Sequence, residues 1–171
     1  LASGEAVGLQ AGKAGNSEAG HLHLGSGRVV LQDDVRLEGA LQDGSFYTNE
    51  VFLSTMDEVR SRGTSLHLLG LLTAKSSHGS IDYPLALLRM AKERGLEKVF
   101  LHVIFDGRST EPGSAPALLE KLEKQVDEIG LGQVVTGVGR GIALDRDGNY
   151  YKIQRTYDAL VHGVGRTVPM R

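Results

Sequence analysis

Apolar and polar positions along this chain follow two periods, and each period predicts one kind of element. Three short apolar runs predict strands at 66–73, 99–105 and 133–137, the first two continuous enough to be buried on both faces. Apolar residues three or four positions apart predict helices at 18–24, 32–41, 49–62, 82–94, 114–129 and 150–161. Because strand and helix alternate, we expect an α/β fold, a mostly parallel sheet with helices on both faces.

The same spacing predicts which side chains form the core. For the helices at 82–94 and 150–161, the residues expected to point inward are Leu85, Leu88, Ala91, Ile153, Tyr157 and Leu160. His67 and His102 alternate with apolar residues inside two predicted strands. This placement favours histidines buried in the core with satisfied hydrogen bonds over metal ligands.

Composition narrows the class of protein. The 171 residues are 40% hydrophobic and 23% charged, which is typical of one soluble globular domain rather than two large ones. A formal net charge of −2 and the lack of a basic, aromatic-rich stripe argue against nucleic acid as a partner. No apolar run is long enough to span a bilayer, so we expect no membrane association.

The termini and the cysteine count bear on context. The absence of cysteine excludes disulfides and thiolate metal sites and favours a cytoplasmic location. The first residue is Leu1, and nothing near it resembles a signal peptide. We therefore expect the chain to be a piece of a longer protein.

A glycine-rich stretch near the N-terminus places a hydroxyl just ahead of a predicted helix. Gly8, Gly12 and Gly15 let the backbone turn sharply before Ser17. The free N–H groups and the dipole at a helix N-terminus favour an anion, so Ser17 can hold a phosphate ester if its oxygen is activated. The alternative, favoured by the local sequence alone, is that Ser17 is only the N-cap of the helix.

Basic side chains follow all three predicted strands. Because the carboxyl ends of parallel strands meet at one edge of a sheet, where α/β proteins bind ligands, we expect these side chains to converge. They are Lys75 and His78 after the first strand, Arg108 after the second, and Arg140 and Arg146 after the third. The planar fork of arginine suits phosphate and carboxylate, so a small, doubly anionic substrate fits this edge. Taken singly, each residue is more typical of a solvated loop charge.

Other motifs are incomplete. The Gly-Lys pair at 12–13 lacks the first glycine and the Ser or Thr of a P-loop. Residues 137–141 hold only a fragment of the dinucleotide-binding pattern. Asp158 and His162 are spaced to share a helix face, but a lone pair of this kind is more typical of a surface contact than of a metal site.

Several short motifs follow one another along the chain with spacings that need no gaps. They are Gly15-Asn16-Ser17-Glu18 with Gly20-His21, Gly25-Ser26-Gly27-Arg28, Asp43-Gly44-Ser45-Phe46, Leu66-His67-Leu68, Asp106-Gly107-Arg108, Gly139-Arg140, Asp145-Arg146-Asp147 and Tyr157-Asp158-Ala159-Leu160-Val161. Any one of them is unspecific. In this order, the set resembles cofactor-independent (2,3-bisphosphoglycerate-independent) phosphoglycerate mutase over nearly the whole chain.

The resemblance implies a reaction and a set of site residues. In that family a serine of the Gly-Asn-Ser-Glu segment is phosphorylated while 3-phosphoglycerate and 2-phosphoglycerate interconvert, and Ser17 matches this catalytic serine. Two Mn²⁺ or Mg²⁺ ions activate the serine, and Ser17 itself matches a metal ligand. The residues that match substrate-binding positions are His78, Arg108, Ser109, Arg140 and Arg146. The resemblance further implies a cytoplasmic glycolytic enzyme of the alkaline phosphatase superfamily that is a monomer when complete.

The chain departs from the family pattern in ways that bear on activity. Ser80 replaces a second histidine after His78, and Ser109 replaces an aspartate that follows the arginine. The latter change removes a carboxylate from the substrate edge. Most of the family's metal ligands match no residue of this chain, so we expect the 171 residues alone to hold no metal pair and to be inactive.

The resemblance also implies a domain organisation. Residues 1–30 match the nucleophile segment of an alkaline-phosphatase-like domain, and residues 31–171 match an incomplete α/β transferase domain that binds the substrate. Ser80 and Ser109 leave open a diverged enzyme acting on another phospho- or phosphono-carboxylate. A non-catalytic anion-binding module that keeps the fold is the third reading. The full-length reading frame discriminates among them, because catalysis needs the Asp/His metal cluster.

Overall fold

The structure is a computed structural model that describes residues 2–74, 76 and 78–168. It divides into two compact units, Leu1–Phe52 and Leu53–Arg171. Lys75, one of the basic residues expected at the sheet edge, lies outside the described residues. The functional division at residues 30 and 31 stays a prediction.

The first unit is built from short helices joined by glycine-rich loops. They are the 3₁₀ helix η1 (Gly4–Val7), α1 (Ser17–Ser26), α2 (Asp33–Asp43) and the 3₁₀ helix η2 (Ser45–Thr48). A hydrogen bond from the Gln32 N–H to the Gly8 carbonyl, 2.9 Å long, closes the loops around α1. Gly8 has φ +68°, and a Cβ there would lie 2.4 Å from the carbonyl oxygen of Val30, so only glycine fits.

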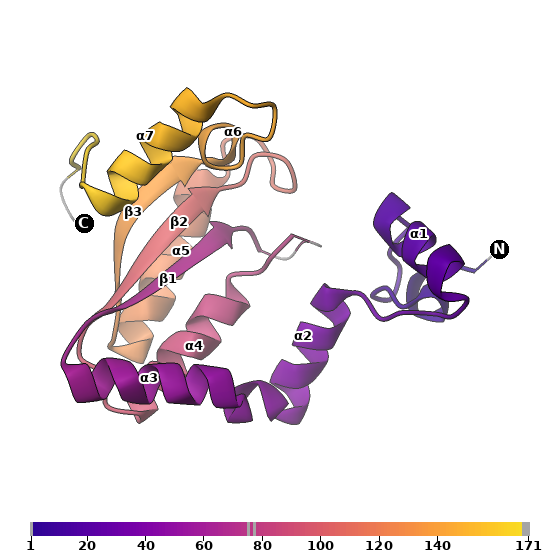
Figure 1. The fold of residues 1–171 in the computed structure, drawn as a ribbon, viewed down its shortest axis with the longest axis horizontal. Coiled ribbons are helices and arrows are strands. Elements are labelled where there is room, and N and C mark those ends of the chain that lie inside the picture. The colour runs from indigo at the N-terminus through magenta and orange to yellow at the C-terminus, as the bar shows by residue number, and fades with distance from the viewer. Residues whose placement is uncertain (1, 75, 77, 169–171) are drawn as a thin grey trace. The chain divides into compact units, whose positions relative to one another are not determined.

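The second unit is organised around a three-stranded sheet. Its strands are β1 (Leu66–Leu72), β2 (Val99–Phe105) and β3 (Gln133–Gly139), parallel and in the order β1-β2-β3 (Figure 1). The register pairs Leu72 with Phe105 and Phe105 with Gly139. All three strands therefore end at the same edge of the sheet.

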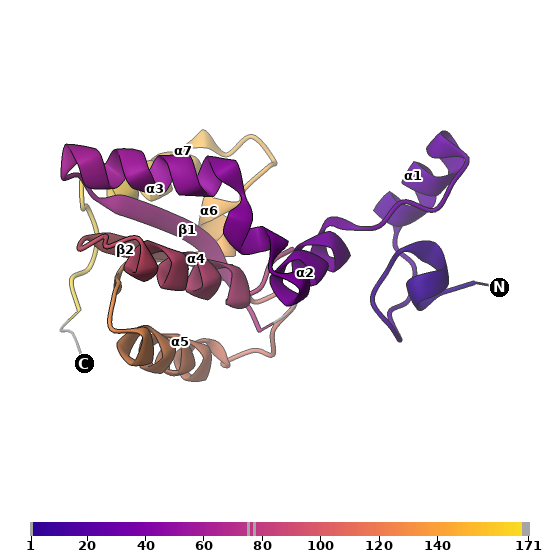
Figure 2. The same ribbon diagram turned by 90° about the horizontal axis from the view of Figure 1, so that it is seen from below.

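Helices lie on both faces of this sheet, as predicted. On one face are α4 (Asp82–Glu93) and α5 (Ala115–Ile129); on the other are the short α6 (Arg140–Ala143) and α7 (Tyr150–Val161) (Figures 1 and 2). The helix α3 (Glu50–Arg62) leads into β1. The core lies between the sheet and α4 and α5, and the largest fully buried side chains include Leu72, Leu85, Leu88, Leu101 and Leu122. The inward positions expected for α4 are confirmed, since Leu85, Leu88 and Ala91 are at most 1% exposed.

The opposite face is less covered than the sequence predicts. Ile153 and Tyr157 of α7 are 37% and 55% exposed, so the prediction that they point into the core is wrong. The expected burial of β1 on both faces is also wrong, because Leu69 is 59% exposed. Two helices, one of them a single turn, leave part of this face to solvent.

The two histidines within strands, His67 and His102, differ in burial. His102 is buried, and its Nε2 and Nδ1 lie 2.9 Å from His67 Nδ1 and 2.7 Å from Thr136 Oγ1. His67 is exposed, which corrects its assignment to the core, although its hydrogen bond is made. Among the described residues, no helix is long and apolar enough to cross a bilayer.

Side chains packed between the sheet and α4 and α5 should dominate the stability of the second unit. Leu88→Ala should lower the free energy of unfolding of the second unit by about 2–5 kcal/mol, because it removes a fully buried side chain and leaves a cavity. Val161→Ala is the control, since Val161 is 56% exposed and its truncation should cost less than about 0.5 kcal/mol. Urea unfolding followed by circular dichroism measures both. Equal losses in the two variants would contradict this placement of the core.

Candidate anion-binding site

Ser17 is the first residue of α1, but it does not cap the helix. The cap is Asn16, whose side-chain oxygen accepts a hydrogen bond from the Ala19 N–H at 2.8 Å. The local alternative that Ser17 is only the N-cap is therefore wrong by one position. The Ser17 side chain is exposed in the first turn, where backbone N–H groups favour an anion.

The His21 ring contacts this hydroxyl. The Nδ1 atom of His21 lies 2.6 Å from the Ser17 carbonyl oxygen and 3.3 Å from Ser17 Oγ. Because a carbonyl oxygen only accepts hydrogen bonds, Nδ1 carries the hydrogen and donates it. His21 is thus not placed to take a proton from Ser17 through this nitrogen.

In the second unit, three of the predicted substrate-binding residues meet at one carboxylate. Asp106 follows β2 directly, and its Oδ1 accepts hydrogen bonds from the Arg108 N–H at 3.1 Å and from Arg140 Nη1 at 2.5 Å. Its Oδ2 accepts from the Ser109 N–H at 3.1 Å. The loop after β2 and the start of α6 after β3 are therefore joined at this point.

The Asp106 carboxylate remains charged in this environment. Its side chain is fully buried, and burial acts to raise its pKa. Hydrogen bonds from Arg140, Arg108 and Ser109 outweigh burial and hold the pKa of Asp106 below its usual 3.8. A buried ion pair with additional backbone donors results, and Arg140 remains 22% exposed.

Arg146 lies on the loop between α6 and α7, which a second aspartate shapes. Asp145 accepts hydrogen bonds from Lys152 Nζ at 2.9 Å and from the backbone N–H groups of Asp147 and Asn149. These donors, chiefly Lys152, lower the pKa of Asp145 to about 2. The Asp145 side chain is 3% exposed, whereas Arg146 is exposed to solvent.

His78 lies on a turn that follows β1. Ser76 and Gly79 pair across this turn, and the His78 N–H donates to Ser76 Oγ at 3.2 Å. Ser80 is buried, and its hydroxyl lies 3.1 Å from the Ala74 carbonyl oxygen and 3.0 Å from Asp82 Oδ2, either of which can accept its one hydrogen. Ser80 thus anchors the turn to the start of α4 and is not exposed to a ligand.

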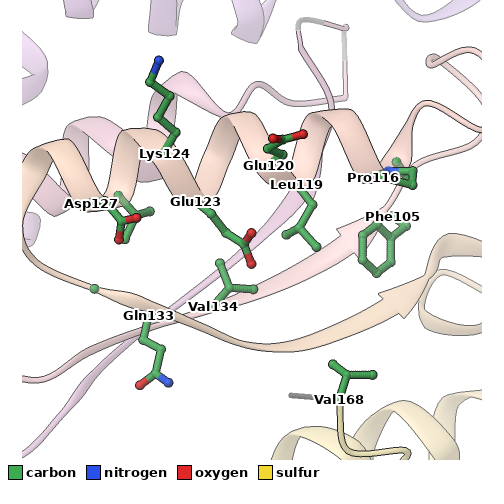
Figure 3. A pocket seen from close by; sticks show the side chains of 13 residues that line it. Phe105, Pro116, Leu119, Glu120, Glu123, Lys124, Asp127, Gln133, Val134 and Val168 are labelled. Atoms are coloured by element: carbon green, nitrogen blue, oxygen red, sulfur yellow. The ribbon is translucent and has the colours of Figure 1, made fainter. Parts of the chain in front are cut away.

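A hollow in the second unit lies away from these strand-end loops. It lies between α5 and β3, where Leu119, Phe105 and Val134 line it (Figure 3). Its remaining lining includes Glu120, Glu123 and Asp127 against the single cation Lys124, which disfavours a doubly anionic ligand. The strand-end loops are the better candidate for an anion.

The described residues include no group of three or more His, Asp or Glu that could hold a metal ion. Asp158 and His162 are both at the end of α7, where the His162 ring packs edge-on against Tyr157. The residues present, Ser17 included, do not fit a two-metal centre by themselves.

Asp106 and Asp145 have no role in the site predicted from the sequence, which names only basic residues and serines. A usable signal was present in both cases. An aspartate at the end of a strand or helix, followed by two or three loop residues, is typical of a side chain that bonds the backbone N–H groups ahead of it.

Known proteins resemble this chain along most of its length. Residues 37–170 match the family described as BPG-independent PGAM N-terminus (iPGM_N). The 2,3-bisphosphoglycerate-independent phosphoglycerate mutases of Saccharophagus degradans and Moorella thermoacetica are both 44% identical to it, over 94% and 96% of this chain. The crystal structure of Leishmania mexicana phosphoglycerate mutase at low cobalt concentration matches 96% of this chain with a TM-score of 0.86 and 31% identity.

The match covers a part of each relative. This chain spans 31% and 32% of the two bacterial enzymes and 31% of the Leishmania chain, so it corresponds to about a third of their length. The family match extends over both the sheet and the strand-end loops that carry Arg108, Arg140 and Arg146. The chain belongs to the iPGM_N family, the N-terminal region of BPG-independent phosphoglycerate mutases.

Proposed function

We propose that the complete protein interconverts 3-phosphoglycerate and 2-phosphoglycerate through a phosphoserine at Ser17. One observation carries the proposal: in a chain of this family, Arg108, Ser109 and Arg140 gather around Asp106 at the edge where three parallel strands end. A phosphorylated carboxylate presents two anionic groups, and this edge supplies several cationic side chains.

Each predicted residue receives a role from its chemistry. Arg108, Arg140 and Arg146 would bind the phosphate and carboxylate through their planar forks, with His78 as a further donor. Ser109 carries a hydroxyl that can donate to or accept from a substrate hydroxyl. Ser17 would receive the phosphoryl group, since its hydroxyl is exposed in a helix turn that favours an anion.

The proposed reaction balances without a further reactant. The bond between phosphorus and one glycerate oxygen breaks as the bond between phosphorus and Ser17 Oγ forms. The serine proton ends on the released glycerate hydroxyl. In the second half, the other glycerate hydroxyl attacks the phosphoserine and its proton returns to Ser17.

Metal ions enter the proposal only for the complete enzyme. Two Mn²⁺ or Mg²⁺ ions would lower the pKa of the serine hydroxyl and neutralise phosphoryl charge. The described residues form no metal-binding group, so residues outside this chain would have to supply most ligands, with Ser17 as the one contributed here. We accordingly propose that the 171 residues alone are inactive. From the family resemblance we further propose that the complete enzyme is cytoplasmic, acts in glycolysis and is a monomer.

A diverged substrate is the second candidate. Ser109 favours it, because this exposed residue stands where the family resemblance implies an aspartate, and the loss of that charge would make the edge more positive. Ser80 does not favour it, since its buried hydroxyl serves the turn after β1. The candidate ligand would be another small phospho- or phosphono-carboxylate.

Ser17→Ala should abolish mutase activity in the complete enzyme while leaving the fold unchanged, because it removes the oxygen that accepts the phosphoryl group. Ser26→Ala is a matched control at the other end of α1, where the hydroxyl donates to the Arg28 carbonyl. Activity assays, circular dichroism and phosphopeptide mapping test both variants. Mutase activity of Ser17→Ala within about tenfold of wild type would be incompatible with a catalytic serine.

Lysine substitutions at Arg108, Arg140 and Arg146 keep the charge but remove the fork. Each should weaken 3-phosphoglycerate binding by roughly 1–3 kcal/mol, the range for a charge-assisted hydrogen bond. Calorimetric titration in a Ser17→Ala background measures affinity without turnover. Arg62→Lys, near the amino end of β1, is the control and should bind normally. Unchanged affinity in all three variants would refute a shared anion site.

Ser109→Asp tests whether the substrate has diverged. If Ser109 weakens recognition of phosphoglycerate, then kcat/KM on 3-phosphoglycerate should rise in the aspartate variant, because the carboxylate can orient Arg108 and accept from a glycerate hydroxyl. Ser114→Asp, on the same loop at the start of α5, controls for added charge alone. A neutral or harmful Ser109→Asp change, with ordinary activity on 3-phosphoglycerate in the wild-type enzyme, would contradict a diverged substrate and leave the mutase proposal.

A further inference from the structure

The carboxylate of Asp106 is the meeting point of two strand-end loops. It accepts two backbone hydrogen bonds from its own loop and one side-chain hydrogen bond from Arg140, which is 34 residues further along the chain. The Asp106 side chain is fully buried and therefore out of reach of a ligand. Asp106 can therefore affect a bound anion only by positioning the groups that donate hydrogen bonds to it.

Those groups are the proposed ligand-binding groups themselves. One Nη1 hydrogen of Arg140 is used by Asp106, and a guanidinium has five N–H donors, so several remain for a ligand. The two backbone bonds fix the peptide units from which the Arg108 and Ser109 side chains extend. A negative charge beside an anion site opposes the anion, and this cost is offset only if the carboxylate orients donors toward it.

We propose that Asp106 is a positioning residue for anion binding. It holds the guanidinium of Arg140 and the Arg108–Ser109 backbone in one arrangement. Arg108 and Arg140 can then bind the same ligand without a change in the loop conformation. The inference rests on the proposed function for the identity of the ligand, a small phosphorylated carboxylate.

A second Asp–Arg pair in the same unit provides the comparison. Asp57 of α3 pairs with Arg94 beyond the end of α4, and it also pairs with Arg60. Asp57 is 41% exposed, and Arg94 precedes β2, away from the carboxyl ends of the strands. This pair braces two helices, so its loss should affect stability and leave ligand binding unchanged.

The test is a mutant cycle in the complete enzyme. Asparagine at 106 presents one oxygen and one NH₂ group, so at least one of the three donors is left facing another donor. Asp106→Asn should raise KM for 3-phosphoglycerate about tenfold with a smaller change in kcat, and Arg140→Lys should do the same. The double variant should be no worse than Arg140→Lys alone by more than about twofold, because the two residues act as one unit. Asp57→Asn should leave KM unchanged, and combined with Arg140→Lys it should be additive.

A role in folding alone gives a different result. Loss of folded enzyme lowers the apparent kcat in proportion and leaves KM at the wild-type value. Wild-type KM in folded Asp106→Asn enzyme, or additive effects of Asp106→Asn and Arg140→Lys, would overturn the proposal.

A second measurement decides the matter if Asp106→Asn does not fold. In arginine-labelled wild-type enzyme, NMR signals of the Arg140 guanidinium, assigned by their loss in Arg140→Lys, should show slow rotation about the Cζ–Nη bonds before ligand is added. Fast rotation of a free guanidinium would overturn the proposal. If the wild-type enzyme lacks mutase activity, the proposed function fails instead, and the NMR measurement still decides the role of Asp106.

Discussion

Backbone hydrogen bonds between three parallel strands bring Leu72, Phe105 and Gly139 to one edge of the sheet. Every predicted substrate-binding residue follows one of these strand ends, so its place in space is set by the strand register. The buried leucines between the sheet and α4 and α5 hold that register from one face. The candidate site is thus a consequence of core packing, although the side chains that form it are mostly exposed.

The cationic side chains at this edge of the sheet are accompanied by aspartates that form ion pairs with cations. A buried carboxylate is costly unless it is paired and hydrogen-bonded, and Asp106 meets both conditions with Arg140 and two backbone N–H groups. Asp145 shapes the Arg146 loop in a similar way, with Lys152 as its cationic partner. Aspartate side chains with little or no solvent exposure therefore support the loops that carry Arg140 and Arg146. Such support reduces the ordering that binding would otherwise require.

Much of the fold could be predicted because its elements repeat apolar residues at clear periods. The bounds of β2 and α7 agree with prediction, and the core residues of α4 are correct. Periodicity does not reveal what covers a face of the sheet, so the prediction that Ile153 and Tyr157 of α7 point into the core was wrong. It also misses α6, which is a single turn, and the Asp106–Arg140 pair, which joins residues 34 positions apart. The basic residues could be proposed for the site from the sequence because they follow strands, and their role stays a prediction. The contacts of Asp106 with Arg140 and of Asp145 with Lys152 are tertiary and leave no periodic signal.

Hydrogen–deuterium exchange on the complete enzyme, with and without 3-phosphoglycerate, tests most directly whether the strand-end loops form one anion site. The account predicts that the ligand slows exchange together, and with one apparent affinity, in peptides covering 76–81, 106–111 and 140–147. Protection confined to the hollow between α5 and β3, or absent from these loops at saturating ligand, would contradict it.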